Sequence, residues 1–422
     1  MNRIFSAYLR RILRQGHLKV IGPDCSIQAF GDGTGPLIVM QLLDERVSDE
    51  LLRNPELALG EAYMDGRIRM ETGTIADLLM LVVQCEGYDA PHWPAALKRI
   101  GRLAGRRLAQ FNPPSIARRN VKAHYDIGDD LYRLFLDPDW QYSCAYFEHD
   151  GASLEEAQLA KKRHLAAKLS LSPGQRVLDI GCGWGGLGLY LAQQTGADVR
   201  GITLSDEQLA RAKDRARSSG LPNPPRFELR DYRKMAGTFD RIVSVGMFEH
   251  VGVGHYDRFF GTCRRLLDPD GVMVLHSIGR TGPPGATNPF ISKYIFPGGY
   301  IPSLSEVFPA LERHGFIVSD VEILRLHYAE TLRHWRERFI ANWQAAAELM
   351  DERFCRMWEF YLAGSEAAFR AGHMMVFQIQ MVRSVNTLPI VRGYMSEAEA
   401  ALRAASSLDA DKRTSVRIRE PA

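Results

Sequence analysis

The sequence has no apolar run long enough to cross a lipid bilayer. Its longest uncharged apolar block is Leu78 to Val83, whereas a membrane-spanning helix needs roughly 20 apolar residues. Residues 1–20 carry basic side chains and no acid, but they lack the continuous apolar core of a secretory signal. The pattern instead predicts an amphipathic helix that ends at Gly16, in a chain that does not cross a membrane.

Cysteines are few and scattered. The six stand at 25, 85, 144, 182, 263 and 355, without a CxxC pair or a histidine at zinc spacing. Disulfide frameworks and structural metal sites need close, regular spacing, so neither is expected and no residue is assigned to a metal. This cysteine usage is typical of a reducing cytoplasm.

Acidic residues are missing from one stretch, between Lys98 and Lys122, which holds eight Lys or Arg residues. Apolar residues recur through it at helical spacing: Leu97, Ile100, Ala104, Leu108 and Phe111. A basic face beside an apolar stripe favours docking on an anionic membrane surface, and a solvated helix packed on its own domain is the alternative. No aromatic-studded basic motif points to nucleic acid. We therefore expect a cytoplasmic protein, peripheral at the inner membrane surface.

What is present is the composition of a large globular protein. The chain has 422 residues, 45% hydrophobic and 24% charged, which is enough for two cores. The turn NPPS at 112–115 excludes a continuing helix, because adjacent prolines lack the backbone N–H donor. We predict a membrane-docking amino-terminal domain over 1–112, a larger domain over 113–390 and a polar tail over 391–422, frayed from 405 onward.

From residue 153 onward, short strands alternate with helices. Ser153 and Glu156 form a capping box for a helix that runs to about Lys168. The expected strands are 176–180, 198–203, 226–230, 240–245 and 272–277, and the expected helices are 185–194, 206–218 and 255–267. Strands joined by crossover helices predict an α/β fold with a doubly wound parallel sheet, beside a smaller α+β amino-terminal domain.

The last third of the larger domain is less regular. A Gly- and Pro-rich stretch over 281–303 is predicted to form a lid over a pocket. A strand over 316–324 is expected next, followed by two helices and a final strand over 374–382.

The stretch VLDIGCGWGGLGLY, residues 177–190, raises the question of a cofactor. Gly181, Gly183 and Gly186 satisfy the GxGxxG spacing of dinucleotide sites. However, Asp179 lies inside the strand before the glycines, and the second strand ends in Thr-Leu-Ser rather than in the acid that binds a ribose. A carboxylate so placed suits a cofactor with a cationic amino-acid end, and a purely structural turn is the alternative.

Two polar side chains follow neighbouring strands. Glu249 comes after the fourth strand and His276 stands near the end of the fifth. Because ligands of parallel sheets bind beyond the carboxyl ends of the strands, we expect both to face one pocket. Taken singly, each has a duller interpretation, as a helix-terminus carboxylate and a hydrogen-bonded core histidine.

The segment VLDIGCG resembles the first motif of class I S-adenosylmethionine methyltransferases, and Asp231-Tyr232 resembles their adenine-binding edge. Further pieces closely resemble the cyclopropane-fatty-acyl-phospholipid synthase family, which includes the mycolic acid cyclopropane synthases. They are HYDIGDDLY (124–132), LFLDPDWQYSCAYF (134–147), GITLSDEQ (201–208), VSVGMFEHVG (243–252), LHSIG (275–279) and KYIFPGGYIPS (293–303). The resemblance runs from about 120 to 385 and extends more weakly to GEAYMDG at 60–66.

The resemblance implies an enzyme that transfers a methylene group from S-adenosylmethionine to cis double bonds of unsaturated phospholipid acyl chains. Its implied cofactor residues are Tyr142, Ser143, Asp179, Gly181, Gly183, Gly185, Thr203, Leu204, Gln208, Asp231 and Tyr232. A bound bicarbonate would act as general base, held by the backbone of Cys144 and Ile278 and by the side chains of Glu249, His276 and Tyr328. Lid aromatics (Tyr294, Phe296 or Tyr300) would stabilise the cation.

Several alternatives stay open. The same first step could end in a methyl- or methylene-branched chain, and a non-catalytic lipid- or cofactor-binding protein is a rival of another class. The resemblance also implies unsaturated phospholipid as the partner and a homodimer as one expected assembly. One departure concerns YLAGSEAAFR, where many relatives have a cysteine at the position of Ser365. A thiol mechanism through that position is therefore impossible, and Ser365 is left out of the site.

Overall fold

The computed structural model describes residues 2–86 and 128–417. The predicted boundary at 112–115 and the basic stretch between Lys98 and Lys122 lie outside these residues. None of the helices in the described ranges is both long and apolar enough to cross a membrane.

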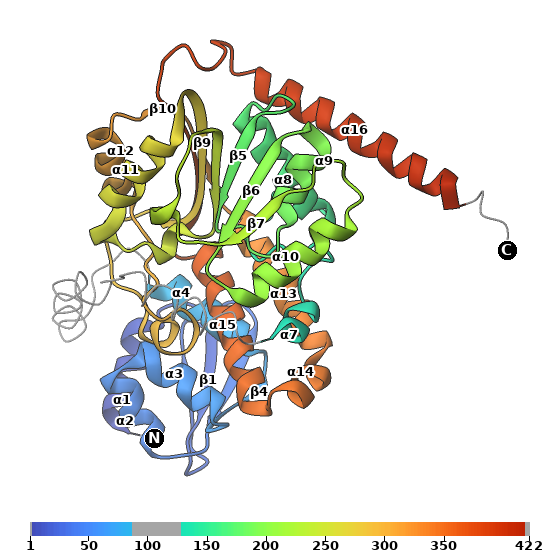
Figure 1. The fold of residues 1–422 in the computed structure, drawn as a ribbon. Coiled ribbons are helices and arrows are strands. Elements are labelled where there is room, and N and C mark those ends of the chain that lie inside the picture. Colours follow the sequence, from blue (N-terminus) through green and yellow to red (C-terminus); the bar gives the residue numbers. More distant parts are fainter. Residues whose placement is uncertain (1, 87–127, 418–422) are drawn as a thin grey trace.

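The amino-terminal part is a four-stranded sheet covered by helices (Figure 1). Its strands, in the order β2-β1-β3-β4, are β1 (His17–Ile21), β2 (Ile27–Phe30), β3 (Leu37–Leu42) and β4 (Ile68–Thr72). Strands β1 and β3 pair in parallel, and the two outer strands pair antiparallel with them. The helices are α1 (Arg3–Ile12), α2 (Arg46–Arg53), α3 (Pro55–Met64) and α4 (Ile75–Glu86). Alternate residues of β1 and β3 are buried, as expected of strands with one face on a core. The first helix ends at Ile12, one turn earlier than predicted.

The larger domain contains a seven-stranded sheet in the order β10-β11-β9-β8-β5-β6-β7. The strands β5 (Arg176–Ile180), β6 (Asp198–Thr203), β7 (Arg226–Leu229), β8 (Phe239–Val245) and β9 (Leu267–Arg280) are parallel to one another. Strand β11 (Met374–Val382) runs antiparallel to β9, and β10 (Ile317–Leu324) pairs antiparallel with β11, so that of these two only β11 runs against the other strands. Strand order reverses between β5 and β8, because β6 and β7 lie on one side of β5 and β8 on the other, so the predicted doubly wound sheet is confirmed. A crevice for a ligand is expected at this switch point.

Helices cover both faces of this sheet (Figure 1). They are α8 (Leu154–Leu169), α9 (Gly186–Thr195), α10 (Asp206–Ser218), α11 (Tyr256–Leu266) and α12 (Leu304–Arg313). Val177 and Val243 pack with α8 and α9, whereas the adjacent Leu178 and Ile242 pack with α11 and α12. Successive strand residues thus enter opposite cores, as the pleat dictates. The predicted capping box of Ser153 and Glu156 is present at α8.

Three helices, not the predicted two, follow β10. They are α13 (His327–Ala341), α14 (Trp343–Leu349) and α15 (Glu352–Arg370), and α7 (Asp129–Arg133) lies beside them. The chain turns at Asn342, and α15 begins at the N-cap Asp351, whose side chain accepts from the Phe354 N–H. Because α15 packs against α3 and α4, it connects the two parts of the molecule.

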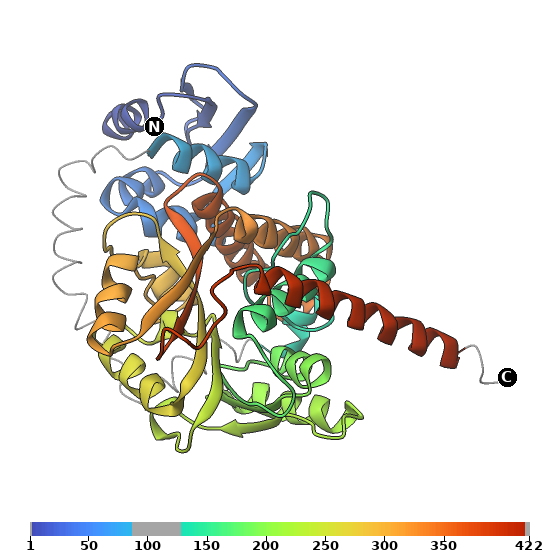
Figure 2. The same ribbon diagram turned by 90° about the horizontal axis from the view of Figure 1, so that it is seen from above.

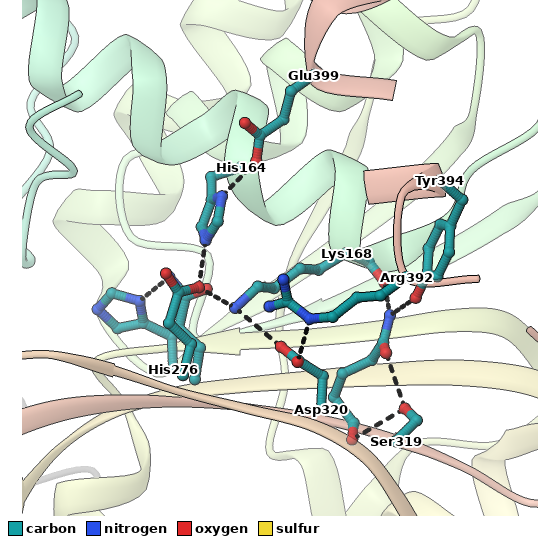
Figure 3. Close-up of polar contacts among 11 residues, drawn as sticks. His164, Lys168, His276, Ser319, Asp320, Arg392, Tyr394 and Glu399 are labelled. Carbon is teal, nitrogen blue, oxygen red and sulfur yellow. Dashed lines mark hydrogen bonds and ion pairs between the residues drawn. The ribbon is translucent and has the colours of Figure 1, made fainter. Parts of the chain in front are cut away.

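The carboxyl-terminal end also differs from the prediction. A helix, α16 (Tyr394–Arg417), occupies most of the expected frayed tail and extends away from the body (Figure 2). Polar side chains hold it: Glu399 contacts His164 of α8, and Arg403 donates to Glu148 at 2.7 Å. Figure 3 shows His164 and Lys168 between Glu399 and the strands that carry Asp320 and His276. The Ala- and Glu-rich sequence favours a helix, and these anchors give its first turns a place to pack.

Candidate active site

A pocket lies at the carboxyl ends of β5, β6 and β8, where the strand order reverses. Its floor is the turn after β5, in which Gly181 has φ +85° and Gly183 has φ +53°. A Cβ on Gly181 would lie 2.8 Å from the Cβ of Met247, whereas the space beside Gly183 is open. Only glycine combines these backbone angles with a close approach of another group. We call this space the glycine-turn pocket.

Ten of the eleven predicted cofactor residues line the glycine-turn pocket: Tyr142, Ser143, Asp179, Gly181, Gly183, Thr203, Leu204, Gln208, Asp231 and Tyr232. Gly185 does not. It is the N-cap of α9, and a Cβ there would meet the ring of Phe227 at 2.7 Å. Its role is therefore in helix packing, because the turn directs it toward the core rather than into the pocket.

The second strand ends in a polar arrangement without an acid. The Thr203 hydroxyl donates to Gln208 Oε1 at 2.9 Å, and Ser205 caps α10 by accepting from the Gln208 N–H. At the end of β7, Asp231 is bound by Arg233, whose Nε lies 2.8 Å from Oδ1. Burial alone would raise the pKa of Asp231, but these hydrogen bonds outweigh it and the pKa is lowered.

Asp179 is the buried carboxyl of this pocket. It is 1% exposed, and among the described residues its Oδ2 has no hydrogen-bond partner. Burial raises its pKa to about 7. A buried carboxylate without a donor is unfavourable, so the position suits a cation or a hydrogen-bond donor brought by a ligand.

A second, larger cavity of about 420 Å³ adjoins the first. Its wall is mainly apolar and includes side chains of α1 and α4, such as Leu9 and Val82. The residues Tyr142, Ser143, Gly246 and His250 line both spaces. We call this space the apolar cavity. It extends from the end of the large sheet into the amino-terminal part.

All five predicted catalytic residues line the apolar cavity: Cys144, Glu249, His276, Ile278 and Tyr328. The predicted convergence of Glu249 and His276 is thus found in the structure. Glu249 belongs to the short helix η2 (Phe248–His250) after β8, and His276 lies on the adjacent strand β9. The parallel pairing of β8 and β9 brings them together, with Val245 opposite His276.

Glu249 is directed by the backbone. The Ile278 N–H donates to its Oε1 at 2.7 Å, while Oε2 has no hydrogen-bond partner in the described parts of the chain. Burial raises the pKa of Glu249 to about 7. The Ile278 N–H, predicted as an anion donor, is therefore engaged by Glu249 here, and an anion would have to share it.

His276 is held in a neutral form. Burial lowers its pKa well below the ordinary value, and the nearby cations Lys161 and Lys168 lower it further. Gln378 of β11 donates from Nε2 to His276 Nδ1 at 3.1 Å. Since Nδ1 accepts this bond, the ring proton resides on Nε2. His276 is therefore a hydrogen-bond donor rather than an acid.

Cys144 and Tyr328 complete the wall. The Cys144 thiol donates to the Ala145 carbonyl at 3.3 Å, and burial raises its pKa, so that it stays protonated. Tyr328 packs its ring against Phe369, with centroids 4.8 Å apart. A thiol so placed is no nucleophile.

The lid over 281–303 joins the two parts of the molecule. Lys293 and Tyr294 both donate to Glu61 of α3, at 2.6 and 2.8 Å. Tyr294 thus bonds the amino-terminal part, whereas Phe296 and Tyr300 line the apolar cavity. The lid contains a π-helical turn, η4 (Ile291–Ile295).

Three wall residues, and one residue that contacts the wall, were not placed in the site from sequence. Ser365, excluded above, lines the apolar cavity, and His250 lines both spaces, with its pKa lowered to about 4 by burial. Lys161 lines the glycine-turn pocket, and Gln378 orients His276. For Gln378 one signal was available, because a glutamine inside the apolar strand MMVFQIQMV needs a polar partner.

Solved structures of other proteins share the fold that carries this site. Coclaurine N-methyltransferase bound to N-methylheliamine and SAH, at 23% identity, shares the fold with a TM-score of 0.63 over 77% of this chain and 98% of that one. The fold is that of the class I S-adenosylmethionine-dependent methyltransferases. Cyclopropane synthase MmaA2 from Mycobacterium tuberculosis matches at 36% identity and a TM-score of 0.61, over 64% of this chain and 99% of that one.

Sequence relatives narrow the class further. The pattern of the mycolic acid cyclopropane synthetase family matches residues 114–379, and a domain of unknown function (DUF7884) matches 5–87. Cyclopropane-fatty-acyl-phospholipid synthase of Escherichia coli (strain K12) is 41% identical over 81% of this chain and 87% of its own. Tuberculostearic acid methyltransferase UfaA1 of Mycobacterium tuberculosis is 40% identical over 90% and 91%. The chain belongs to the mycolic acid cyclopropane synthetase family.

Proposed function

We propose that this enzyme transfers a methylene unit from S-adenosylmethionine to the cis double bond of an unsaturated phospholipid acyl chain, forming a cyclopropane. The observation that carries the proposal is the junction of the two spaces. The glycine-turn pocket meets the apolar cavity at Tyr142, Ser143, Gly246 and His250, and Glu249 and His276 lie on the wall of that cavity.

The residues of the glycine-turn pocket fit S-adenosylmethionine. The unsatisfied carboxyl of Asp179 suits the amino-acid end, and the open space beside Gly183 admits a ligand against the backbone. The Thr203 hydroxyl and the Gln208 side-chain amide offer polar groups to the ribose of the cofactor. When bound, S-adenosylmethionine supplies an electrophilic methyl group.

The apolar cavity suits the acyl chain. An isolated double bond is a weak nucleophile, and water would compete for a developing positive charge, so the reaction needs a dry wall. Aromatic faces of Tyr142, Phe296 and Tyr361 line this cavity and can stabilise such a charge. The apolar side chains of α1 and α4 lengthen the cavity toward the amino-terminal part, where the rest of the chain would lie.

Ring closure requires loss of one proton from the transferred methyl group. We propose bicarbonate as the base, with His276 donating to it from Nε2 and Glu249 Oε2 accepting its hydroxyl proton. Without that acceptor, two like charges would repel each other. Tyr328 and the backbone at Cys144 and Ile278 would complete the anion site. The proton leaves on bicarbonate as carbonic acid, and the C–H electron pair closes the ring.

The proposal is tested with purified enzyme, methyl-labelled S-adenosylmethionine and vesicles of monounsaturated or fully saturated phosphatidylethanolamine. We expect label only in the unsaturated lipid, with cyclopropane protons at high field in the proton NMR spectrum. Bicarbonate-depleted buffer should slow the reaction, and added bicarbonate should restore it. Absence of label in unsaturated lipid would refute the function, whereas indifference to bicarbonate would refute only the base.

One specific observation favours an alternative product. One relative that covers 90% of this chain is a tuberculostearic acid methyltransferase by name, and a methyl- or methylene-branched chain can arise from the same first step. The same NMR spectrum separates the products, because only the cyclopropane gives ring methylene protons.

We also propose peripheral association with the inner membrane surface, since the substrate lies in a bilayer and the cavity reaches the amino-terminal part. A homodimer is proposed as the assembly. Sedimentation with anionic and neutral vesicles, and analytical ultracentrifugation without them, test these two points.

A further inference from the structure

Lys161 brings a buried ammonium group into the glycine-turn pocket. It lies on α8, is 1% exposed and lines the pocket. Its Nζ donates to Gln141 Oε1 at 2.7 Å and to Ser143 Oγ at 2.8 Å. Neither acceptor is charged, and an ammonium has three N–H donors. The position therefore leaves a buried cation with capacity for one more acceptor.

Asp179 places the opposite charge in the same pocket. No ion pair between Asp179 and Lys161 is found among the described residues, although both line the pocket. Burial lowers the pKa of Lys161 to about 8, just as it raises that of Asp179. Lys161 acts on Asp179 through space and lowers its pKa, and Asp137 raises that of Lys161, but desolvation outweighs these charges and neither Lys161 nor Asp179 has a hydrogen-bonded ion-pair partner among the described residues.

We propose that Lys161 and Asp179 together form a receptor for the zwitterionic amino-acid end of S-adenosylmethionine, with Lys161 binding the α-carboxylate and Asp179 the α-ammonium. This assignment deepens the proposed function and rests on its cofactor. The zwitterionic end carries an ammonium and a carboxylate on the same carbon, so it satisfies both buried groups at once. Charge-assisted hydrogen bonds of this kind are about twice as strong as neutral ones.

The surroundings hold Lys161 in one orientation. Gln158, one turn earlier on α8, donates to the carbonyls of Gln141 and Ser143 at 3.2 and 3.0 Å, which ties the 141–143 segment to the helix. A Cβ on Gly186 would lie 2.3 Å from Gln141 Nε2, so a glycine there leaves room for this side chain. Ser143 Oγ accepts from Lys161 and keeps its own hydrogen to donate to the same carboxylate.

Calorimetric binding of two ligands tests the assignment without lipid or turnover. One is S-adenosylhomocysteine, and the other is its decarboxylated analogue, which lacks only the α-carboxylate. We expect the wild-type enzyme to prefer S-adenosylhomocysteine by roughly 10- to 100-fold. In Lys161→Met the ratio of the two affinities should fall to near one, because the variant loses affinity for S-adenosylhomocysteine and largely keeps its affinity for the analogue. Lys213→Met, at an exposed position of α10, is the matched control and should keep the preference.

Preservation of the wild-type preference in Lys161→Met would overturn the assignment. If that variant binds neither ligand, Lys161→Gln decides by the same criterion, and circular dichroism confirms that each variant is folded. Asp179→Asn supplies the reciprocal test, with loss of preference for S-adenosylhomocysteine over its deaminated analogue. An enzyme that shows these preferences but leaves lipid unmodified would refute the proposed function and keep the receptor.

Discussion

Replacing Glu249 with glutamine removes one charge and one proton acceptor while preserving the shape of the side chain. The amide oxygen can still accept from the Ile278 N–H, which now lies 2.7 Å from Oε1. Glu249 holds the proposed bicarbonate base, and loss of general-base catalysis typically slows turnover by about 10²- to 10⁴-fold. Affinity for S-adenosylhomocysteine should stay within about threefold, because Glu249 lines the apolar cavity and not the glycine-turn pocket.

The same substitution has a consequence for stability that follows from burial. The pKa of Glu249 is raised from 4.5 to about 7, so the folded state holds the proton more tightly than the unfolded state. Wild-type stability therefore falls as pH rises from about 4.5 through 7. At 1.36 kcal/mol per pKa unit, the loss reaches about 3 kcal/mol. Glutamine has no such ionisation, so the variant should be more stable than wild type by up to about 3 kcal/mol at pH 8.

Urea unfolding of both proteins at pH 5 and pH 8 measures this difference, and labelled-methyl transfer to unsaturated vesicles measures turnover. Glu312→Gln, at an exposed position of α12, is the control and should change neither. In wild type, kcat/KM should rise with pH through about 7, since the ionised carboxylate is the competent form. If the difference in stability between wild type and Glu249→Gln is the same at both pH values, the desolvated carboxylate is refuted. If Glu249→Gln turns over at the wild-type rate, Glu249 has no part in the mechanism.

Three further predictions concern the surrounding walls. Gln378→Leu should leave His276 without the group that donates to its Nδ1 and should lower kcat by about 10- to 100-fold. Nitrogen-15 NMR should show a changed tautomer of the His276 ring, and an unchanged His276 spectrum would contradict the role of Gln378. Val82→Phe, in the amino-terminal wall of the apolar cavity, should lower the rate of methyl transfer to lipids with long acyl chains more than to lipids with short ones. An equal loss of rate for both lipids would argue against this wall as the binding site of the acyl chain. Gly181→Ala places a Cβ 2.8 Å from Met247 at φ +85°, so the free energy of unfolding, measured with urea, should fall by about 1–3 kcal/mol. The affinity for the cofactor, measured by calorimetry, should also fall.

Much of the large sheet and its first turn could be predicted from the sequence, because their signals are local. Alternation of apolar strands with amphipathic helices gave the strands β5 to β9 within a few residues of their observed bounds. Glycines with positive φ, preceded by a carboxylate in the strand, marked the pocket floor. Glu249 and His276 could be placed at one edge because parallel strands share the direction of their carboxyl ends.

Other features could not be predicted, because they depend on partners distant in the sequence. Between α13 and α15 the helical pattern is continuous enough to suggest two helices, and the turn at Asn342 became visible only in three dimensions. The tail from 391 onward contains many polar residues, yet α16 contacts His164 on α8 and Glu148 in the loop before that helix. Gly185 belongs to the same glycine run as Gly183, and only its contact with Phe227 removes it from the pocket.

The sequence by itself determined the fold class, the family and the turn that holds a cofactor, since these rest on short-range periodicity and on motifs that match over most of the chain. Tertiary structure alone decided which charged side chains line the pocket. The run KKRH on α8 has the composition of a solvated face, but packing buries it and directs Lys161 into the pocket beside Asp179. The environment of a charge is set by what packs around it, and desolvation by those neighbours changes its chemistry.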